Sequence, residues 1–156
     1  MMSQKGGVMN NLQSLVQKAH QSGDYNQLLE TIPYAQTLGV RCERFGNEVV
    51  FVLPKRDQNL GNPILPAIHG GVIGGFMEIA AAFHLAIFLE IDDLPRIVDF
   101  SLDYLRAGFH QETYAECRLT RQGNRVANVS VSAWQKKKQE PIALARAHFL
   151  LPIKER

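Results

Sequence analysis

Apolar residues gather in one long stretch of this 156-residue chain, residues 68–89, which reads IHGGVIGGFMEIAAAFHLAIFL. From Val72 to Leu89 they fall on every face of a helical wheel, which predicts a helix that is buried all round. Two ionisable residues, Glu78 and His84, interrupt the run. A carboxylate among apolar neighbours is costly unless it is paired, protonated or functional. This helix therefore marks both the expected core and a candidate for chemistry.

Shorter elements are predicted ahead of this helix. Residues 1–9 are expected to form a disordered extension, and residues 10–156 a single domain. A first helix, capped by an asparagine, stops at Gly23, and a second short helix over residues 25–32 ends before Pro33. Both helices are expected to pack against the sheet described next.

The remaining pattern is that of strands. Residues 37–45 and 48–54 flank a Gly-Asn turn and predict a hairpin, and a long loop over residues 55–68 leads into the central helix. After the helix, apolar and polar residues alternate, with Val98 and Tyr104 at the two ends of one apolar face. Alternation continues through residues 113–120, 128–133 and 142–151. Short connections make these strands antiparallel, so the chain is predicted to be α+β.

Composition and charge narrow the function classes. The formal net charge is +2 and no basic patch is concentrated enough for nucleic acid, since Lys136–Lys138 lies at an expected hairpin turn. Cys42 and Cys117 fit no metal or redox spacing and are expected to be reduced, buried thiols of a cytoplasmic protein. The apolar run has the length of a membrane span, but its central glutamate and four glycines disfavour that interpretation.

The start of the central helix is a candidate for binding a carbonyl oxygen. Gly70 and Gly71 lie where backbone N–H groups lack partners inside the helix and the helix dipole is positive. Glu78 is eight residues farther along, about 12 Å at the rise of an α-helix. If the first amide and this carboxylate act on one small group, they must come from two chains. Gly75 shares the face of Glu78 and leaves space beside it.

Other interpretations of these residues stay open. The glycines could simply allow a tight turn, and Glu78 could be a buried acid satisfied by a partner. The candidate partners are Asn62, Arg96 and Arg106. His69 could be a base, or its ring could hold the loop by hydrogen bonds. The sequence has no metal-binding spacing and no nucleotide-binding loop, so no cofactor is expected.

The segment HGGVIGGFMEIA resembles the helix start of hotdog-fold acyl-CoA thioesterases of the PaaI-like, phenylacetate-pathway group. In that group an acidic residue follows the histidine of His-Gly-Gly by nine positions, and His69 and Glu78 have this spacing. The segments FSLDYLRAG, GNRVANVSVSAW and ALARAHFLL resemble later strands of the family. The resemblance implies a curved sheet wrapped around the long helix. It also implies a homodimer with active sites at its interface, with a dimer of dimers as a further option.

The resemblance also implies roles in hydrolysing an acyl-CoA thioester. The Gly70 amide would polarise the thioester carbonyl, and Glu78 of the other chain would be the nucleophile or general base. Family members often carry Asn or Gln six residues before the histidine, where it would orient the water or the carboxylate. That position is Pro63 here, so Asn62 is the first choice for this role and Asn59 the second. Substrate contacts are assigned to Gly71, Asn59, Gly75 and Arg106.

Two alternatives belong to other functional classes. A non-catalytic acyl-CoA-binding module would have the same fold, although retention of Glu78 argues against it. The segment NPILPAIHGG faintly resembles the loop of acyl-carrier-protein dehydratases, which place a catalytic histidine about fourteen residues before the acid. That position is Ile64 here, so the dehydratase pairing fails.

Overall fold

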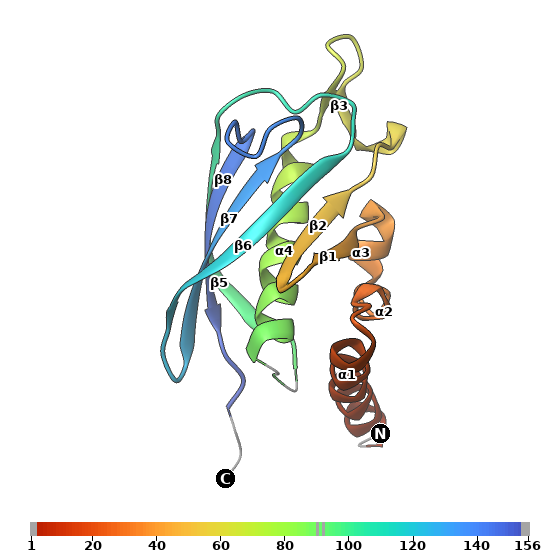
Figure 1. Ribbon diagram of the computed structural model, residues 1–156, viewed down its shortest axis with the longest axis vertical. Helices are drawn as coiled ribbons and strands as arrows, with labels where there is room; N and C mark the ends of the chain where they lie inside the picture. Colours follow the sequence, from red (N-terminus) through yellow and green to blue (C-terminus); the bar gives the residue numbers. More distant parts are fainter. Residues whose placement is uncertain (1–2, 90, 92, 154–156) are drawn as a thin grey trace.

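The structure, a computed structural model, describes residues 3–89, 91 and 93–153. Within these residues, six antiparallel strands form one curved sheet in the order β1-β2-β6-β7-β8-β5, with the long helix α4 against one face (Figure 1). The bounds are α4 Gly70–Leu89, β1 Arg41–Phe45, β2 Glu48–Leu53, β5 Arg96–Tyr104, β6 Thr113–Gln122, β7 Val126–Trp134 and β8 Ala143–Leu150. This is the hotdog arrangement that the resemblance implied, and the α+β prediction is confirmed.

The core lies between α4 and the concave face of the sheet. Alternate residues of β6, β7 and β8 point inward and are buried, among them Ala115, Val131 and Ala145. The fully buried large side chains include Phe76 and Phe83 of α4. Small alanines on the central strands let α4 approach the sheet closely, so the period-two pattern in the sequence predicted this face correctly.

Strand β5 departs from the predicted alternation at one residue. Its register against β8 shifts between Ile97 and Asp99, which is a β-bulge. The bulge leaves Val98 60% exposed, while Ile97 packs against the core instead. The prediction that Val98 faces inward with Phe100 was therefore wrong. The extra residue of the bulge shifts the alternation, so the side chains before the bulge face the opposite way from the prediction.

The N-terminal helices differ from their predicted bounds. Helix α1 spans Ser3–Ser22, so residues 3–9, expected to be disordered, are helical here; Met1 and Met2 lie outside the described residues. A helix that has formed extends at little cost per residue. Helix α2 is limited to Asn26–Leu29.

A third helix, α3 over Pro33–Leu38, replaces the predicted first part of the strand from Thr37. Proline suits the first helical position because its missing N–H needs no partner there. Gly39 ends the helix with φ of 73°, a left-handed conformation that suits glycine. These two residues explain why the strand begins only at Arg41.

The segment expected to be a long loop is partly ordered. It contains a 3-10 turn, Asp57–Asn59, and a two-stranded hairpin of β3 Leu60–Asn62 and β4 Ala67–Ile68. The hairpin projects beyond the main sheet next to the start of α4 (Figure 1). Ile64 at its tip is 94% exposed.

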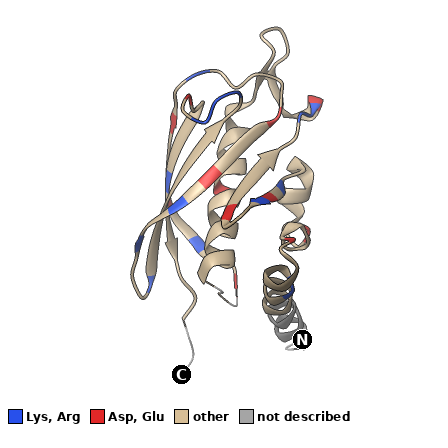
Figure 2. Ribbon diagram, viewed as in Figure 1, with Lys and Arg blue, Asp and Glu red and all other residues tan. Residues whose placement is uncertain are grey.

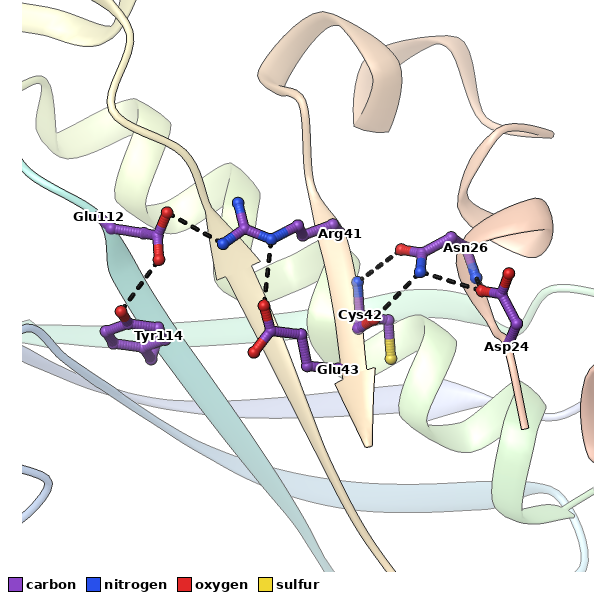
Figure 3. A network of polar contacts seen from close by, with 7 residues as sticks. All are labelled: Asp24, Asn26, Arg41, Cys42, Glu43, Glu112 and Tyr114. Carbon is purple, nitrogen blue, oxygen red and sulfur yellow. Dashed lines mark hydrogen bonds and ion pairs between the residues drawn. The ribbon is translucent and has the colours of Figure 1, made fainter. Parts of the chain in front are cut away.

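Polar contacts connect the N-terminal helices to the edge of the sheet (Figure 3). The Asn26 side chain accepts a hydrogen bond from the Cys42 amide at 2.8 Å and donates one to the Cys42 carbonyl at 3.1 Å. Arg41 pairs with Glu112 at 2.9 Å across the neighbouring strand and lowers the pKa of that carboxyl by hydrogen bonding. The sheet therefore holds α2, and with it α3, in a defined position.

Both cysteines are free and buried, as predicted. Burial raises the pKa of the Cys42 thiol to about 12, and burial also raises the pKa of Cys117. Neither thiol is therefore activated as a nucleophile.

Helix α4 is long and apolar enough to cross a membrane by length and composition, the one such helix among the described residues. Of its most apolar window, 61% is buried inside the protein, so it serves as the core helix. The prediction that it is buried all round was wrong along one stripe, where Gly71 is exposed and Gly75, Glu78 and Ala82 are half-buried. Charged residues lie mainly on the strands and loops, and Glu78 is the one charged residue of α4 (Figure 2).

Candidate active site

His69 fixes the entry into α4. Its backbone N–H donates to the Asn59 carbonyl at 2.8 Å, which ties it to the 3-10 turn. Its ring Nδ1 accepts a hydrogen bond from the Gly71 amide at 2.9 Å. A Cβ on Gly61 would lie 2.7 Å from the His69 Cα, so glycine there lets β3 approach this residue. Of the two roles considered for His69, its contacts support the one of holding the loop.

The first amides of α4 are not equivalent. The Gly71 N–H is taken by the His69 ring, and Val72 and Ile73 donate to the His69 carbonyl at 3.0 and 3.2 Å. Only the Gly70 N–H of this first turn has no acceptor in the part of the chain described. With the helix dipole behind it, this amide can bind a carbonyl oxygen that becomes negative. The assignment of the Gly71 amide to substrate binding does not agree with this geometry, because that amide is already used.

Tyr104, at the end of β5, closes the other side of this turn. Its hydroxyl donates to the Gly70 carbonyl at 2.6 Å. A Cβ on Gly70 would lie 3.1 Å from the Tyr104 oxygen, so the tyrosine packs directly on the glycine. The alternating pattern predicted an inward-facing Tyr104, but it gave no sign of this hydrogen bond, which joins residues far apart in the sequence.

Replacing His69 by Ala should lower the free energy of unfolding by about 1 kcal/mol, because the Gly71 amide loses its acceptor. Urea unfolding measures this change. In wild type, Gly71→Ala should also destabilise, since the new Cβ would meet the His69 ring at 3.0 Å. In the His69→Ala background the same substitution should stabilise, because alanine is the better helix former. Equal effects of Gly71→Ala in both backgrounds would contradict this function of the ring.

The Glu78 side chain is half-buried on the open stripe of α4 and makes no hydrogen bond or ion pair with any described residue. None of its three candidate partners binds it. Asn62 uses its Oδ1 to accept hydrogen bonds from the Ile64 and Leu65 amides, and Arg106 lies 4.0 Å from Glu140. Arg96 is exposed in β5. The carboxylate is therefore available for chemistry, and the described residues of this chain do not include a partner of the kind that the buried-pair interpretation needs.

Asn59 is better placed near His69 than Asn62. The Asn62 side chain is exposed and is committed to the tip of the hairpin, so the structure does not bring this first-choice residue to the site. Asn59 is 5% exposed, and its Nδ2 lacks a partner among the described residues. A buried amide donor without an acceptor is costly in a folded protein. Asn59 thus keeps a free donor beside the start of α4.

Helix α4 runs without a break from Gly70 to Leu89. The Gly70 amide and the Glu78 backbone are therefore about 12 Å apart along its axis, as inferred from the sequence.

A hollow of about 370 Å³ lies on the outer face of the sheet, away from this helix, and is lined by residues that include Arg118, Ser130 and Arg146. The chemistry-bearing groups lie instead on the open stripe of α4.

His84 does not belong to this group. It lies six residues after Glu78, off its face, and packs on Phe88 with ring centroids 4.5 Å apart. Burial lowers the pKa of His84 to about 4, so the ring is neutral at neutral pH. No cluster of three metal-binding side chains occurs in the described ranges. The candidate site thus consists of Gly70, Glu78 and the loop that carries His69.

Comparisons with known proteins show which family this chain resembles. The model of the thioesterase superfamily matches residues 65–142, which include the start of α4 and Glu78. The medium/long-chain acyl-CoA thioesterase YigI of Escherichia coli K12 is 28% identical over 136 residues, covering 77% of this chain and 86% of that protein.

Solved structures also match. A protein from Chromobacterium violaceum is 42% identical, with 90% of this chain and 98% of that chain covered and a TM-score of 0.73. A phenylacetic acid degradation-related protein from Ralstonia eutropha JMP134 is 22% identical, with coverage of 77% and 91% and a TM-score of 0.67. At 22% identity, the similarity to the Ralstonia protein shows a shared fold alone.

Proposed function

Because the chain belongs to the thioesterase superfamily, we propose that it hydrolyses acyl-CoA thioesters to a free acid and CoA. The observation that supports this most directly is that one helix carries both a free backbone amide, at Gly70, and a carboxylate without a partner, at Glu78. The similarity to a medium/long-chain acyl-CoA thioesterase favours fatty acyl groups of that length as substrates.

Each step of the proposed reaction uses a group already described. The Gly70 N–H binds the thioester oxygen and stabilises the negative charge that develops there. Glu78 from a second chain accepts a proton from water while the water oxygen attacks the carbonyl carbon. The tetrahedral intermediate collapses, the C–S bond breaks, and the CoA thiolate takes up the proton. In a variant of this route the Glu78 carboxylate attacks the carbonyl carbon first, the C–S bond breaks, and the CoA thiolate leaves a mixed anhydride. Water then hydrolyses the anhydride, which frees the acid and restores the carboxylate, and the thiolate takes up the proton released.

The sheet edge supports a homodimer. Strand β5 ends the sheet, and in the described residues its outer edge has no neighbouring strand. A nine-residue open edge is a template for pairing with another chain. Val98 and Tyr104 expose apolar surface along it. We infer that two copies pair through β5, which places the start of one α4 near the Glu78 stripe of the other.

The remaining parts of the proposal rest on single features. Buried free thiols fit a cytoplasmic protein, where cysteines stay reduced. Arg106 lies exposed beyond β5 near the start of α4 and is a candidate for binding CoA phosphates. The dehydratase alternative places its base at residue 64, an apolar isoleucine at the exposed hairpin tip, so nothing supports it.

A panel of thioesters tests the proposed function. Release of free thiol should be fastest with medium- and long-chain acyl-CoA, and slower with short-chain and aryl-CoA substrates. Acyl-carrier-protein thioesters serve as the comparison for recognition of the CoA group. Tight binding of acyl-CoA without thiol release would replace hydrolysis by the binding-module alternative.

A further inference from the structure

Tyr34 of α3 lies directly on the open stripe of α4. A Cβ placed on Gly75 would lie 2.8 Å from the Tyr34 hydroxyl oxygen and 3.0 Å from its Cε1. Contacts this short are not tolerated by real side chains, so the phenol ring rests on the helix backbone where glycine leaves room. A residue with a side chain at position 75 would displace the ring.

Hydrogen bonds hold the helix that carries Tyr34. The Thr37 hydroxyl donates to the Pro33 carbonyl at 3.1 Å, and Arg56 donates to the Thr37 carbonyl at 3.1 Å. Asn26 holds the preceding helix to β1 (Figure 3). The hydroxyl of Tyr34 itself has no partner among the described residues, and the side chain is 49% exposed. An ordered donor is thus held on the stripe with nothing to bind.

Glu78 follows Gly75 by three residues and shares its face of the helix. Side chains of an α-helix lean toward its N-terminus, so a glutamate covers the turn that precedes it. This lean brings the Glu78 carboxylate toward the turn that contains Gly75, where the Tyr34 hydroxyl lies. Both polar groups without partners on this part of the helix are therefore within reach of the same turn.

We propose that Tyr34 is a positioning residue for Glu78 of the same chain, with its hydroxyl donating a hydrogen bond to one carboxylate oxygen. The other oxygen then faces the water and the thioester carbon. Hydrogen bonds of this kind often tighten only when substrate is bound. The proposal rests on the proposed function, because it assigns Tyr34 a task only if Glu78 reacts.

Kinetics of Tyr34→Phe test the proposal. The ring and its packing on Gly75 remain, so KM for acyl-CoA should stay within about twofold, while kcat should fall about 10-fold through loss of carboxylate orientation. The matched control is Tyr114→Phe, which removes a hydroxyl that donates to Glu112 and makes no contact with Glu78, and which should leave kcat unchanged. If Tyr34 had only a structural role, Tyr34→Phe would not lower kcat while leaving KM unchanged.

A double-mutant cycle with Gly75→Ala adds an independent readout. The new Cβ displaces the phenol, so Gly75→Ala should lower kcat by a similar factor, and Tyr34→Phe should cost little more in that background. Additive effects, or an unchanged kcat in Tyr34→Phe, would overturn the proposal. Full activity of Glu78→Gln would instead refute the proposed function, whatever Tyr34 does.

Discussion

Replacement of Glu78 by Gln should reduce kcat for acyl-CoA hydrolysis about 1,000-fold, because the amide can neither accept the proton of water nor attack the carbonyl. The change keeps the size and polarity of the side chain. The folded protein should be as stable as wild type or slightly more stable, since a half-buried carboxylate without a partner is costly. Steady-state thiol release and urea unfolding measure the two effects.

Glu140→Gln is the matched control for this experiment. Glu140 is an exposed acid in the turn between β7 and β8, paired loosely with Arg106 and Lys137. Its replacement should leave kcat unchanged, because exposed ion pairs contribute little and Glu140 lies off the Glu78 stripe. If Glu78→Gln kept more than about a tenth of wild-type kcat, a loss below that expected for a general base, Glu78 would be neither base nor nucleophile.

Local patterns predicted the main elements of this fold. Helix α4 and the inward faces of β6, β7 and β8 follow from periods of 3.6 and two residues, which short-range patterning sets. The bulge at Val98 and the helix over Pro33–Leu38 were missed for different reasons. A bulge depends on pairing with a distant strand, and a six-residue helix is stabilised mainly by packing.

The site was predictable where it depends on spacing along one helix. The separation of Gly70 and Glu78 follows from helix rise, and the structure keeps them on one unbroken helix. The use of the Gly71 amide by His69 could not be read from the pattern, because it depends on the rotamer of one ring. The choice of Asn62 over Asn59 failed for a related reason, since only the folded hairpin shows which side chain caps the turn.

The contacts of Tyr34 and Tyr104 with glycines of α4 were not predicted from the sequence. Each packs on a glycine of α4 from an element more than thirty residues away in the chain. A glycine in a helix costs roughly 1 kcal/mol relative to alanine. The glycines at 70, 71, 74 and 75 are therefore the signal that could have shown where other groups approach this helix closely.

Mixing two inactive variants should restore activity if each site uses two chains. The first variant is Glu78→Gln and the second is Gly70→Val, whose side chain would displace Tyr104 and cover the free amide. After joint unfolding and refolding, half of the dimers contain one chain of each kind. Such a dimer has one site with both groups intact, so the mixture should show about a quarter of wild-type activity.

The reciprocal mixture distinguishes this arrangement from a site within one chain. In the second experiment, equal amounts of wild type and of a chain carrying both substitutions are combined. Before the chains exchange, the wild-type dimers give about half of the activity of wild type alone. After joint refolding, every site of a mixed dimer lacks one group, so the activity should fall to about a quarter. A site within one chain predicts no restoration in the first mixture and no loss in the second. If both groups act on one thioester carbonyl, the two-chain result is expected, because eight residues of helix separate the Gly70 amide from Glu78.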